Sequence, residues 1–203
     1  MRVLPVTLEG THVRLEPLTS YHHEALSRVG LDEDLWRLSP TALETAEDMC
    51  QYVESALRAQ VDGTALPFAI VERGSGTVVG STRYGNIDRA NRRVEIGWTW
   101  VARPWQRTAV NTECKYLLLR HAFETLGCIR VEFKTDALNE RSRQAILRIG
   151  AKEEGIFRNH MVTFTGRIRD SVYFSIIDSE WPAVRVRLEA MLERPAPSQP
   201  SAT

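Results

Sequence analysis

A strand-to-helix corner between residues 98 and 119 holds the residues whose types and spacing could do chemistry. Alternating tryptophans lead through Pro104 into Gln106-Arg-Thr-Ala-Val-Asn111, and a helical pattern follows. The first turn of a helix carries backbone N–H groups without partners, and the helix dipole favours negative charge there. Small polar residues at this corner let an anion approach those N–H groups. The corner is therefore a candidate anion-binding site.

The composition of the chain excludes several other functions. Lys and Arg number 26, and Asp and Glu also number 26, in 203 residues. The resulting zero net charge gives no attraction to nucleic acid or to an anionic membrane. The chain shows no apolar run with the length of a membrane span and no signal-peptide pattern. Three widely spaced cysteines, Cys50, Cys114 and Cys128, form no disulfide framework and favour a reducing cytosol. We expect a cytoplasmic protein.

Patterns of other catalytic sites are missing from the sequence. His22, His23 and His160 lack the spacing of metal ligands, so we expect no metal site. No nucleophile elbow, P-loop lysine or dinucleotide-binding fingerprint is present. The corner thus stays the strongest chemical signal.

The order of predicted elements indicates an α/β (α+β) fold. Polar and apolar residues alternate over 12–18, as in a half-buried strand. Thr19 or Ser20 can cap a short helix after it, and Thr45 with Asp48 can open a longer amphipathic helix. Three strands with short turns follow and indicate an antiparallel meander, over 67–71, 77–84 and 94–101.

The second half of the chain continues with a helix, a strand, a helix, a hairpin and a last helix. These elements are predicted over 110–126, 129–135, 140–149, 155–177 and 180–192. We expect one domain over 1–193 and a disordered tail over 194–203, where proline and serine are frequent. In the strand over 94–101, strict alternation places Glu95 on the face opposite Ile96, Trp98 and Trp100.

Over roughly residues 6–192, this order resembles the GCN5-related N-acetyltransferase (GNAT) family. Three places carry the resemblance: Val94-Glu-Ile-Gly97, the corner, and Asn139-Glu-Arg-Ser142 followed by Gly150-Ala-Lys-Glu-Glu-Gly-Ile-Phe-Arg158. Together they look like the branch of ribosomal-protein N-terminal acetyltransferases, the RimJ/RimL type. The resemblance implies a central, twisted, mixed but mostly antiparallel sheet of about seven strands flanked by helices.

The same resemblance implies an enzyme and its partners. The implied activity is an acetyl-CoA-dependent N-acetyltransferase, which moves an acetyl group to a primary amine by direct attack of the amine on the thioester. A protein N-terminal α-amine is the acceptor that this branch suggests, and an antibiotic, polyamine or metabolite amine stays open. Dimers are common in the branch, which implies a homodimer here.

The resemblance also assigns residues to acetyl-CoA. Backbone N–H groups at the corner would hold the pyrophosphate, and the strand before it would pair with the pantetheine arm. The pyrophosphate residues are then Gln106, Arg107, Thr108, Ala109, Val110, Asn111 and Thr112, and those for the arm are Trp98, Thr99, Trp100, Val101 and Asn139.

Two residues match catalytic positions of the branch. Glu95 matches the base, which acts on the amine through water, and Ser142 matches the proton donor to the leaving thiolate. Bland alternatives exist: Glu95 as a solvent-facing strand residue, and Asn139 with Ser142 as a helix cap and a first-turn residue. The acidic residues 32–34 could attract a cationic amine or form a solvated turn.

Two residues of the corner depart from the family pattern [QR]-x-x-G-x-[GA]. Ala109 replaces the glycine, and Asn111 replaces the small residue. An alanine forced into a left-handed conformation costs about 1–2 kcal/mol, whereas a helical alanine costs nothing. These departures keep open a non-catalytic acyl-CoA-binding or regulatory module with a degenerate pyrophosphate loop. A purely structural interaction protein is a third hypothesis.

Overall fold

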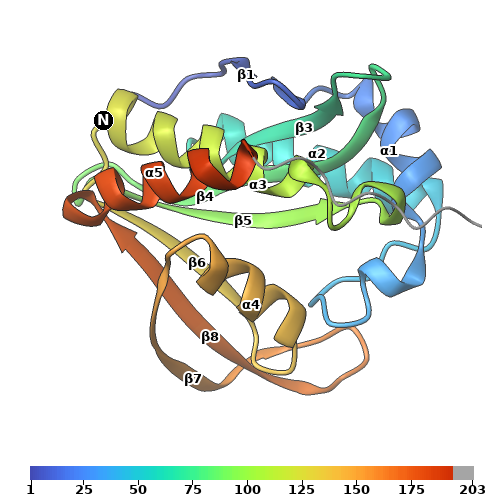
Figure 1. The fold of residues 1–203 in the computed structure, drawn as a ribbon. Helices are drawn as coiled ribbons and strands as arrows, with labels where there is room; N and C mark the ends of the chain where they lie inside the picture. The colour runs from blue at the N-terminus through green and yellow to red at the C-terminus, as the bar shows by residue number, and fades with distance from the viewer. Residues whose placement is uncertain (194–203) are drawn as a thin grey trace, which may run out of the picture.

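The computed structural model describes residues 1–193, which surround an eight-stranded sheet (Figure 1). The strands are β1 (Leu8–Glu9), β2 (Val13–Pro17), β3 (Leu66–Glu72), β4 (Val78–Asp88), β5 (Arg93–Val101), β6 (Arg130–Asp136), β7 (Lys152–Val162) and β8 (Ile168–Ile177). The helices are α1 (His22–Gly30), α2 (Ala46–Val61), α3 (Ala109–Arg120), α4 (Glu140–Arg148) and α5 (Trp181–Leu192). Within these described residues, no helix has the length and apolar character that crossing a membrane requires. The disorder predicted for 194–203 lies outside the described residues.

The sheet is mixed but mostly antiparallel, as predicted. Its strand order is β1-β2-β3-β4-β5-β6-β8-β7, and only β5 and β6 pair in parallel. The meander and the closing hairpin are confirmed, because β3, β4 and β5 follow one another and β7 pairs with β8. β1 was not predicted, because a strand of two residues has too little pattern to recognise.

Helices cover the two faces of the sheet unequally. On one face α3, α4 and α5 contribute to a large apolar core with β1 to β6 and β8. On the other face α1 and α2 form a smaller core against Ala69 of β3 and Trp100 of β5. Among residues 1–193, this smaller core includes nothing from β6, β7 or β8. Because Val94 and Ile96 belong to the large core, Glu95 lies on the second face, which we call the Glu95 face.

Helix starts follow the predicted chemistry in one case and not in another. The Thr45 side chain accepts from the Asp48 N–H, and the Asp48 carboxylate accepts from the Thr45 N–H, which confirms the predicted start of α2. The prediction that Thr19 or Ser20 caps α1 is wrong. The residue before α1 is Tyr21, whose side chain forms no cap, while His22 Nδ1 accepts from the Thr19 N–H at 3.0 Å.

A bulge in β5 interrupts the strict alternation that the sequence suggests. Ser81 pairs with Trp100 while Arg83 pairs with Gly97, so one extra residue of β5 stands between these pairs. Trp98, inside this bulge, has φ of 50°. The bulge turns Trp100 to the Glu95 face, opposite Ile96. The Trp98 ring lies on the Glu95 face too, 5.6 Å from Lys134 Nζ, which pairs with Glu95. The prediction that Trp98 and Trp100 share the face of Ile96 is therefore wrong.

β5 and β6 pair only at their beginnings. Their partners are Arg93 with Arg130, Val94 with Val131, and Glu95 with Glu132, and beyond these pairs the two strands diverge (Figure 1). The backbone of β5 after Glu95 still pairs with β4 on its other side. The β6 side of the bulged segment thus offers backbone donors and acceptors to a ligand.

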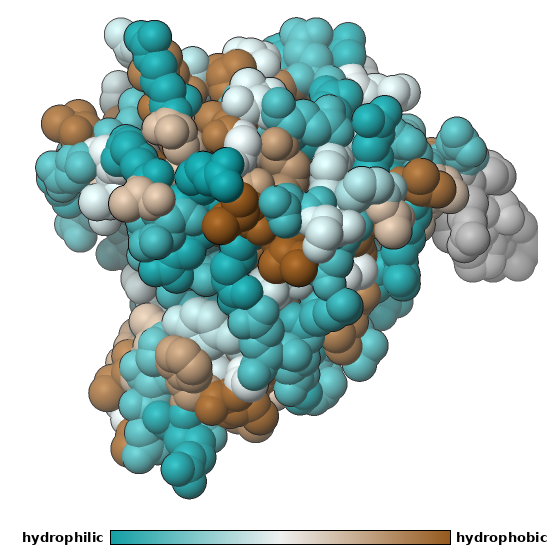
Figure 2. Space-filling model, turned by 90° about the vertical axis from the view of Figure 1, so that its left-hand side faces the viewer, coloured by the Kyte–Doolittle hydropathy of each residue, from teal (hydrophilic) through white to brown (hydrophobic). Residues whose placement is uncertain are grey.

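The closing hairpin forms the far edge of the sheet. Its turn contains Gly166, whose φ of 79° favours glycine, as predicted for the turn. Apolar side chains reach the surface at the lower end of the molecule, where this hairpin lies (Figures 1 and 2); they include Ile156, Phe157, Val162 and Ile168. The same turn is fixed to the segment between α1 and α2, because the Phe164 N–H donates to the Pro40 carbonyl at 2.9 Å.

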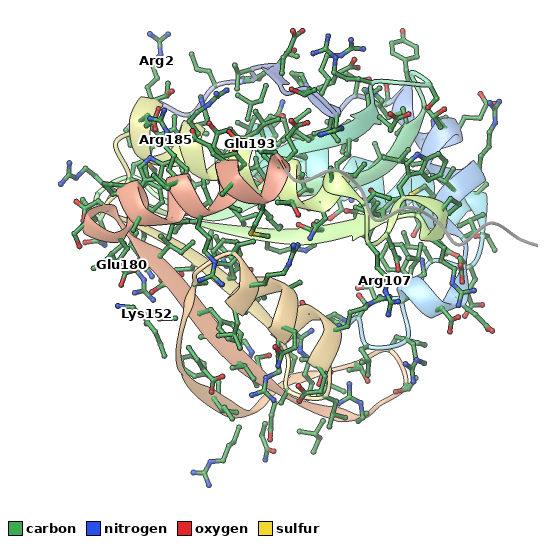
Figure 3. All side chains as sticks on the ribbon, in the orientation of Figure 1. Arg2, Arg107, Lys152, Glu180, Arg185 and Glu193 are labelled. Carbon is green, nitrogen blue, oxygen red and sulfur yellow. The ribbon has the colours of Figure 1, made fainter. Side chains whose placement is uncertain are left out.

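Ion pairs hold β7 in the sheet. Lys152 at its start pairs with Glu180 at 2.5 Å (Figure 3). Arg130 of β6 donates two hydrogen bonds of 2.6 Å to Glu154 of β7, which also accepts from Ser175 of β8. The bonds from Arg130 and Ser175 lower the pKa of Glu154 to about 2. Glu154 therefore joins three strands through its charged form.

Glu154→Gln should reveal this link as a pH dependence. The pKa of Glu154 falls from 4.5 to about 2 on folding, so its stabilising effect is complete above pH 4.5 and is lost as the pH falls through 2. We expect the variant to be less stable than the wild type at pH 7, with the difference shrinking between pH 4.5 and 2. Urea unfolding over a pH series measures this difference. A difference that is independent of pH would contradict it.

Candidate active site

The predicted corner is formed by the end of β5, a short turn and the start of α3. A 3-10 turn over Arg103–Trp105 follows the strand, and Thr108 then caps α3 with its hydroxyl, which accepts from the Val110 N–H at 3.3 Å. The remaining N–H groups of the first turn have no partner within the helix. The structure thus places the predicted residues 106–112 together at a helix start suited to an anion.

Backbone strain at the corner lies on Arg107 and not on Ala109. Arg107 has φ of 62°, in the left-handed region, whereas Ala109 is the first residue of α3. Asn111 also lies within the first turn of α3. The two departures from the family pattern therefore occupy helical positions, where they cost little. The main objection to anion binding at this corner loses its physical basis.

Arginines from α4 add positive charge to the corner. The Gln106 side chain donates to the Val101 carbonyl at 2.8 Å and accepts from Arg141 at 2.8 Å, so it connects β5 with α4. Arg148 donates to the Thr112 hydroxyl at 3.0 Å. Among residues 1–193, Arg107, Arg141 and Arg148 form no ion pair with a carboxylate. Figure 3 shows Arg107 near the start of α3, on the side away from Lys152 and Glu180.

Arg141 and Arg148 were not predicted to lie at the corner. Their spacing of seven residues places both on one face of α4, two helical turns apart. That signal was present in the sequence. What could not be predicted is that this face of α4 turns towards the start of α3.

The acidic segment between α1 and α2 is attached to the same corner. Arg103 pairs with Asp32 at 3.4 Å and also with Asp34. Both carboxylates thus neutralise an arginine of the chain. The hypothesis that these carboxylates attract a cationic amine is therefore not supported. The alternative of a solvated turn fits better, and this turn is held by ion pairs with Arg103.

Glu95 is buried, with 2% of its surface exposed. Its Oε2 accepts from Asn86 Nδ2 at 2.8 Å and pairs with Lys134 Nζ at 3.1 Å. Within residues 1–193, Oε1 accepts no hydrogen bond, and it lies 2.9 Å from where a Cβ on Gly97 would be. The alternative that Glu95 is an ordinary solvent-facing strand residue is therefore wrong. A held carboxylate with one free oxygen is suited to accept a proton.

Asn139 and Ser142 lie at the start of α4. Asn139 Oδ1 accepts from the Ser142 N–H at 3.0 Å, so the predicted cap is confirmed. Within the described chain, the Ser142 hydroxyl has no hydrogen-bond partner and no hydrogen bond joins Ser142 to Glu95. The side-chain oxygen of Asn139 makes the cap, which leaves the two N–H donors of the same side-chain amide for other partners.

Thr99 belongs to a buried polar chain on the α3 side of the sheet. Its hydroxyl lies 2.7 Å from the Thr82 hydroxyl and accepts from Lys115 Nζ at 2.7 Å. Burial lowers the pKa of Lys115 to about 8. Thr99 belongs to the segment of β5 that diverges from β6. Its hydroxyl thus connects this segment with the buried amine of Lys115, which was not predicted from the sequence.

An aromatic cluster on the Glu95 face encloses Arg83. The Arg83 guanidinium lies 5.0 Å from the ring centres of Tyr52 and Trp98, and the Tyr52 hydroxyl donates to the Trp98 carbonyl at 3.4 Å. Lys134 Nζ lies 5.6 Å from the same Trp98 ring. Trp98 therefore connects Arg83 with the carboxylate of Glu95 through Lys134. Trp100, by contrast, packs in the core against Trp36.

Three residues of the site hold left-handed backbone without being glycine: Asn86, Trp98 and Arg107. Such residues cost about 1–3 kcal/mol each and concentrate at functional sites. Asn86 holds Glu95, Trp98 forms the bulge, and Arg107 forms the corner. Two further left-handed residues, Arg92 in a turn and Asn159 at an irregularity of β7, lie outside the site, so strain in this chain is frequent at the site without being confined to it.

The chain is similar to known proteins in sequence and in fold. The family model described as acetyltransferase (GNAT) domain matches residues 12–152. A protein of Bacillus subtilis (strain 168), named as a ribosomal N-acetyltransferase, YdaF, is 35% identical over 106 residues, which cover 52% of this chain and 57% of that protein. The chain thus matches little more than half the length of this relative.

Solved structures are similar over nearly the whole chain. A GCN5-related N-acetyltransferase from Brucella melitensis is 34% identical with a TM-score of 0.87, covering 94% of this chain and 86% of that one. RimJ of Mycobacterium smegmatis, solved in complex with CoA-disulfide, is 26% identical with a TM-score of 0.79, covering 92% and 95%.

Substituting glycine at two positions of the corner should have opposite effects. Arg107→Gly relieves a left-handed side chain and should raise the free energy of unfolding by about 0.5–1 kcal/mol. Ala109→Gly, its matched control, removes a helix former and should lower that free energy by about 0.5–1 kcal/mol. Chemical denaturation measures both. A destabilised Arg107→Gly beside a stabilised Ala109→Gly would mean that the strain lies on Ala109.

Lys115→Met should expose the cost of the buried amine. The pKa of Lys115 falls from 10.5 to about 8 on folding, so between these values the unfolded chain binds more protons than the folded one. The wild type should therefore gain stability relative to Lys115→Met as the pH rises from 8 to 10.5. Urea unfolding of both proteins over this range is the measurement. Parallel pH profiles would show that Lys115 is not desolvated.

Proposed function

The chain belongs to the GNAT acetyltransferase family, and we propose that it transfers an acetyl group from acetyl-CoA to a primary amine by direct attack of the amine on the thioester. The observation that carries this proposal is the corner beside the diverging strands. There, the first turn of α3 and three arginines without carboxylate partners within residues 1–193 face one region. Coenzyme A carries the anionic phosphates that such a region would bind.

The residues of the chain fit acetyl-CoA in two ways. The N–H groups of residues 107–112, with Arg107, Arg141 and Arg148, would hold its phosphates. The unpaired side of β5 from Trp98 to Val101 would pair with the amides of its pantetheine arm. When bound, acetyl-CoA supplies the thioester carbonyl that the amine attacks.

Glu95 would act as the base. An ammonium has no lone pair for attack, and an α-amine with a pKa of about 7.7–8.0 loses its proton readily near neutral pH. Glu95 Oε1 would accept this proton through a water molecule, while Asn86 and Lys134 hold Oε2 in place. The amine nitrogen then forms a bond to the carbonyl carbon.

Ser142 would complete the transfer. When the C–S bond breaks, the sulfur leaves as a thiolate, and the Ser142 hydroxyl would donate a proton to it. The proton that the amine lost returns to the serine oxygen through solvent. The products are an amide and the free thiol of coenzyme A, so atoms and charge balance.

The acceptor that we propose is a primary amine, with a protein N-terminal α-amine as the leading candidate. This choice is supported by the name of the Bacillus subtilis relative, which refers to ribosomal N-acetylation, and by the RimJ-like structure. The cytoplasmic location and the homodimer expected from the sequence stay predictions.

Glu95→Gln tests the proposal. The variant keeps the shape of the side chain but cannot accept the proton, so kcat should fall about 100-fold with coenzyme A affinity unchanged. Ser142→Ala should lower kcat about tenfold. Initial rates of thiol release from acetyl-CoA, with a panel of peptides and small amines, measure both effects. Glu9→Gln, at an exposed glutamate of β1 four strands away from β5, is the matched control and should turn over normally.

Other results would favour the other hypotheses. If neither substitution slowed turnover, the roles of Glu95 and Ser142 would be wrong. Calorimetric binding of coenzyme A without turnover on the whole panel would favour the non-catalytic module. A protein that binds no coenzyme A at millimolar concentration would be an interaction protein.

A further inference from the structure

We propose that the acceptor carries a carboxylate near its amine and that Arg83 binds this carboxylate. The inference rests on the proposed function and specifies the acceptor of the same site. Arg83 lies on β4, on the Glu95 face, between the rings of Tyr52 and Trp98. No part of the proposed acetyl transfer uses it.

Arg83 is a buried cation that has no counter-ion among residues 1–193. Only 5% of its surface is exposed, and its Nε is a buried atom without a hydrogen-bond partner. Within residues 1–193, its guanidinium takes part in no hydrogen bond or ion pair, and it lies against the faces of two aromatic rings. A guanidinium is charged at every relevant pH and presents five N–H donors.

This arrangement is unfavourable unless something else completes it. Burying a charge without an ionic partner costs more free energy than a cation–π contact returns. Two rings therefore compensate only part of the cost. The rings also hold the planar guanidinium in one orientation, as bidentate recognition of a carboxylate requires.

The other cations of the Glu95 face already have partners. Lys134 pairs with Glu95 at 3.1 Å. Arg169 donates to Ser171 at 3.1 Å and lies 4.0 Å from Asp136. In the described part of the chain, Arg83 is thus the buried cation of this face that lacks an anionic partner.

The position of Arg83 relative to Glu95 limits where that anion can be. Glu95 pairs with Gly85, and Arg83 is two residues before Gly85 on the same strand, so the two are diagonal neighbours. Diagonal neighbours in a sheet are about 7–8 Å apart. A ligand whose amine is near Glu95 would reach Arg83 with an anion a few bonds away.

A carboxylate close to a primary amine satisfies both groups. It occurs in a free amino acid and in a peptide whose first residue is acidic. A neutral amine or a polyamine would leave Arg83 without a counter-ion. The charge of the site therefore selects among the acceptors that the sequence left open.

Matched pairs of acceptors test this inference. One pair is an amidated tetrapeptide that begins with Asp and its counterpart that begins with Asn; the other is alanine and alaninamide. We expect the wild type to prefer the anionic member of at least one pair by about tenfold in kcat/KM. The pair that shows the preference identifies the source of the carboxylate.

Substitutions at Arg83 assign the preference to this residue. Arg83→Met should reduce it to less than about twofold, chiefly through KM, and Arg83→Lys should keep part of it. Arg58→Met, on the exposed side of α2 in an ion pair with Glu54, is the matched control and should keep all of it. Equal rates for both members of both pairs with the wild type, or a preference that survives in Arg83→Met, would overturn the inference.

A binding measurement separates this inference from the proposed function. In a nitrogen–proton correlation spectrum of the coenzyme A-loaded protein, the Arg83 Nε–H signal is assigned by its loss in Arg83→Lys. The anionic member of a pair should shift this signal, and the neutral member should not. No shift with either anionic member would overturn the inference, even if acetyl transfer is found. A shift without turnover on any amine would show that Arg83 binds a carboxylate and would count against the proposed transfer, so the two failures are distinguishable.

Discussion

The divergence of β5 and β6 after Glu95 is the constraint on which the site depends. Two neighbouring strands that continued in register would bury their N–H and C=O groups in each other and leave nothing for a ligand. Here pairing stops after Glu95 and Glu132, and the bulge at Trp98 follows immediately. A sheet that stays closed on the β4 side can then offer an open edge in its interior.

The helices make this opening usable. α3 begins where β5 ends, so its first-turn N–H groups lie at the wide end of the divergence (Figure 1). α4 begins after β6 and turns Arg141 and Arg148 towards the same place. The smaller core under α1 and α2 stops at β5, which leaves the Glu95 face without a helix over β6 and β8 within residues 1–193. One sheet thus separates a corner suited to phosphate from a face suited to an amine.

Local patterns predicted most of the fold because each pattern has a local cause. Thr45 and Asp48 fix the start of α2 through their own side chains, and Gly166 permits its turn by lacking a Cβ. The bulge was not predictable in this way, because Trp98 is not a residue that favours left-handed backbone. Nothing in the letters around Trp100 reveals that its face is reversed.

Residues of the site were predictable only where sequence order alone defines them. Residues 106–112 are neighbours along the chain, so the corner was recognisable. Arg83, in contrast, gains its role from Tyr52 and Trp98, which are distant in sequence. Whether a buried cation has an ionic partner depends on tertiary packing, and the periodicity of a strand does not predict it.

The strained residues Asn86, Trp98 and Arg107 have a consequence for how this protein can be altered in the laboratory. Selection for heat tolerance alone rewards glycine where the side chain makes few contacts, as at the exposed Arg107, because glycine removes the conformational penalty. Such a replacement would take a cation from the corner, and at Asn86 it would remove a hydrogen bond from Glu95. Thermostable variants selected without a screen for turnover would therefore carry substitutions at residues of the candidate site.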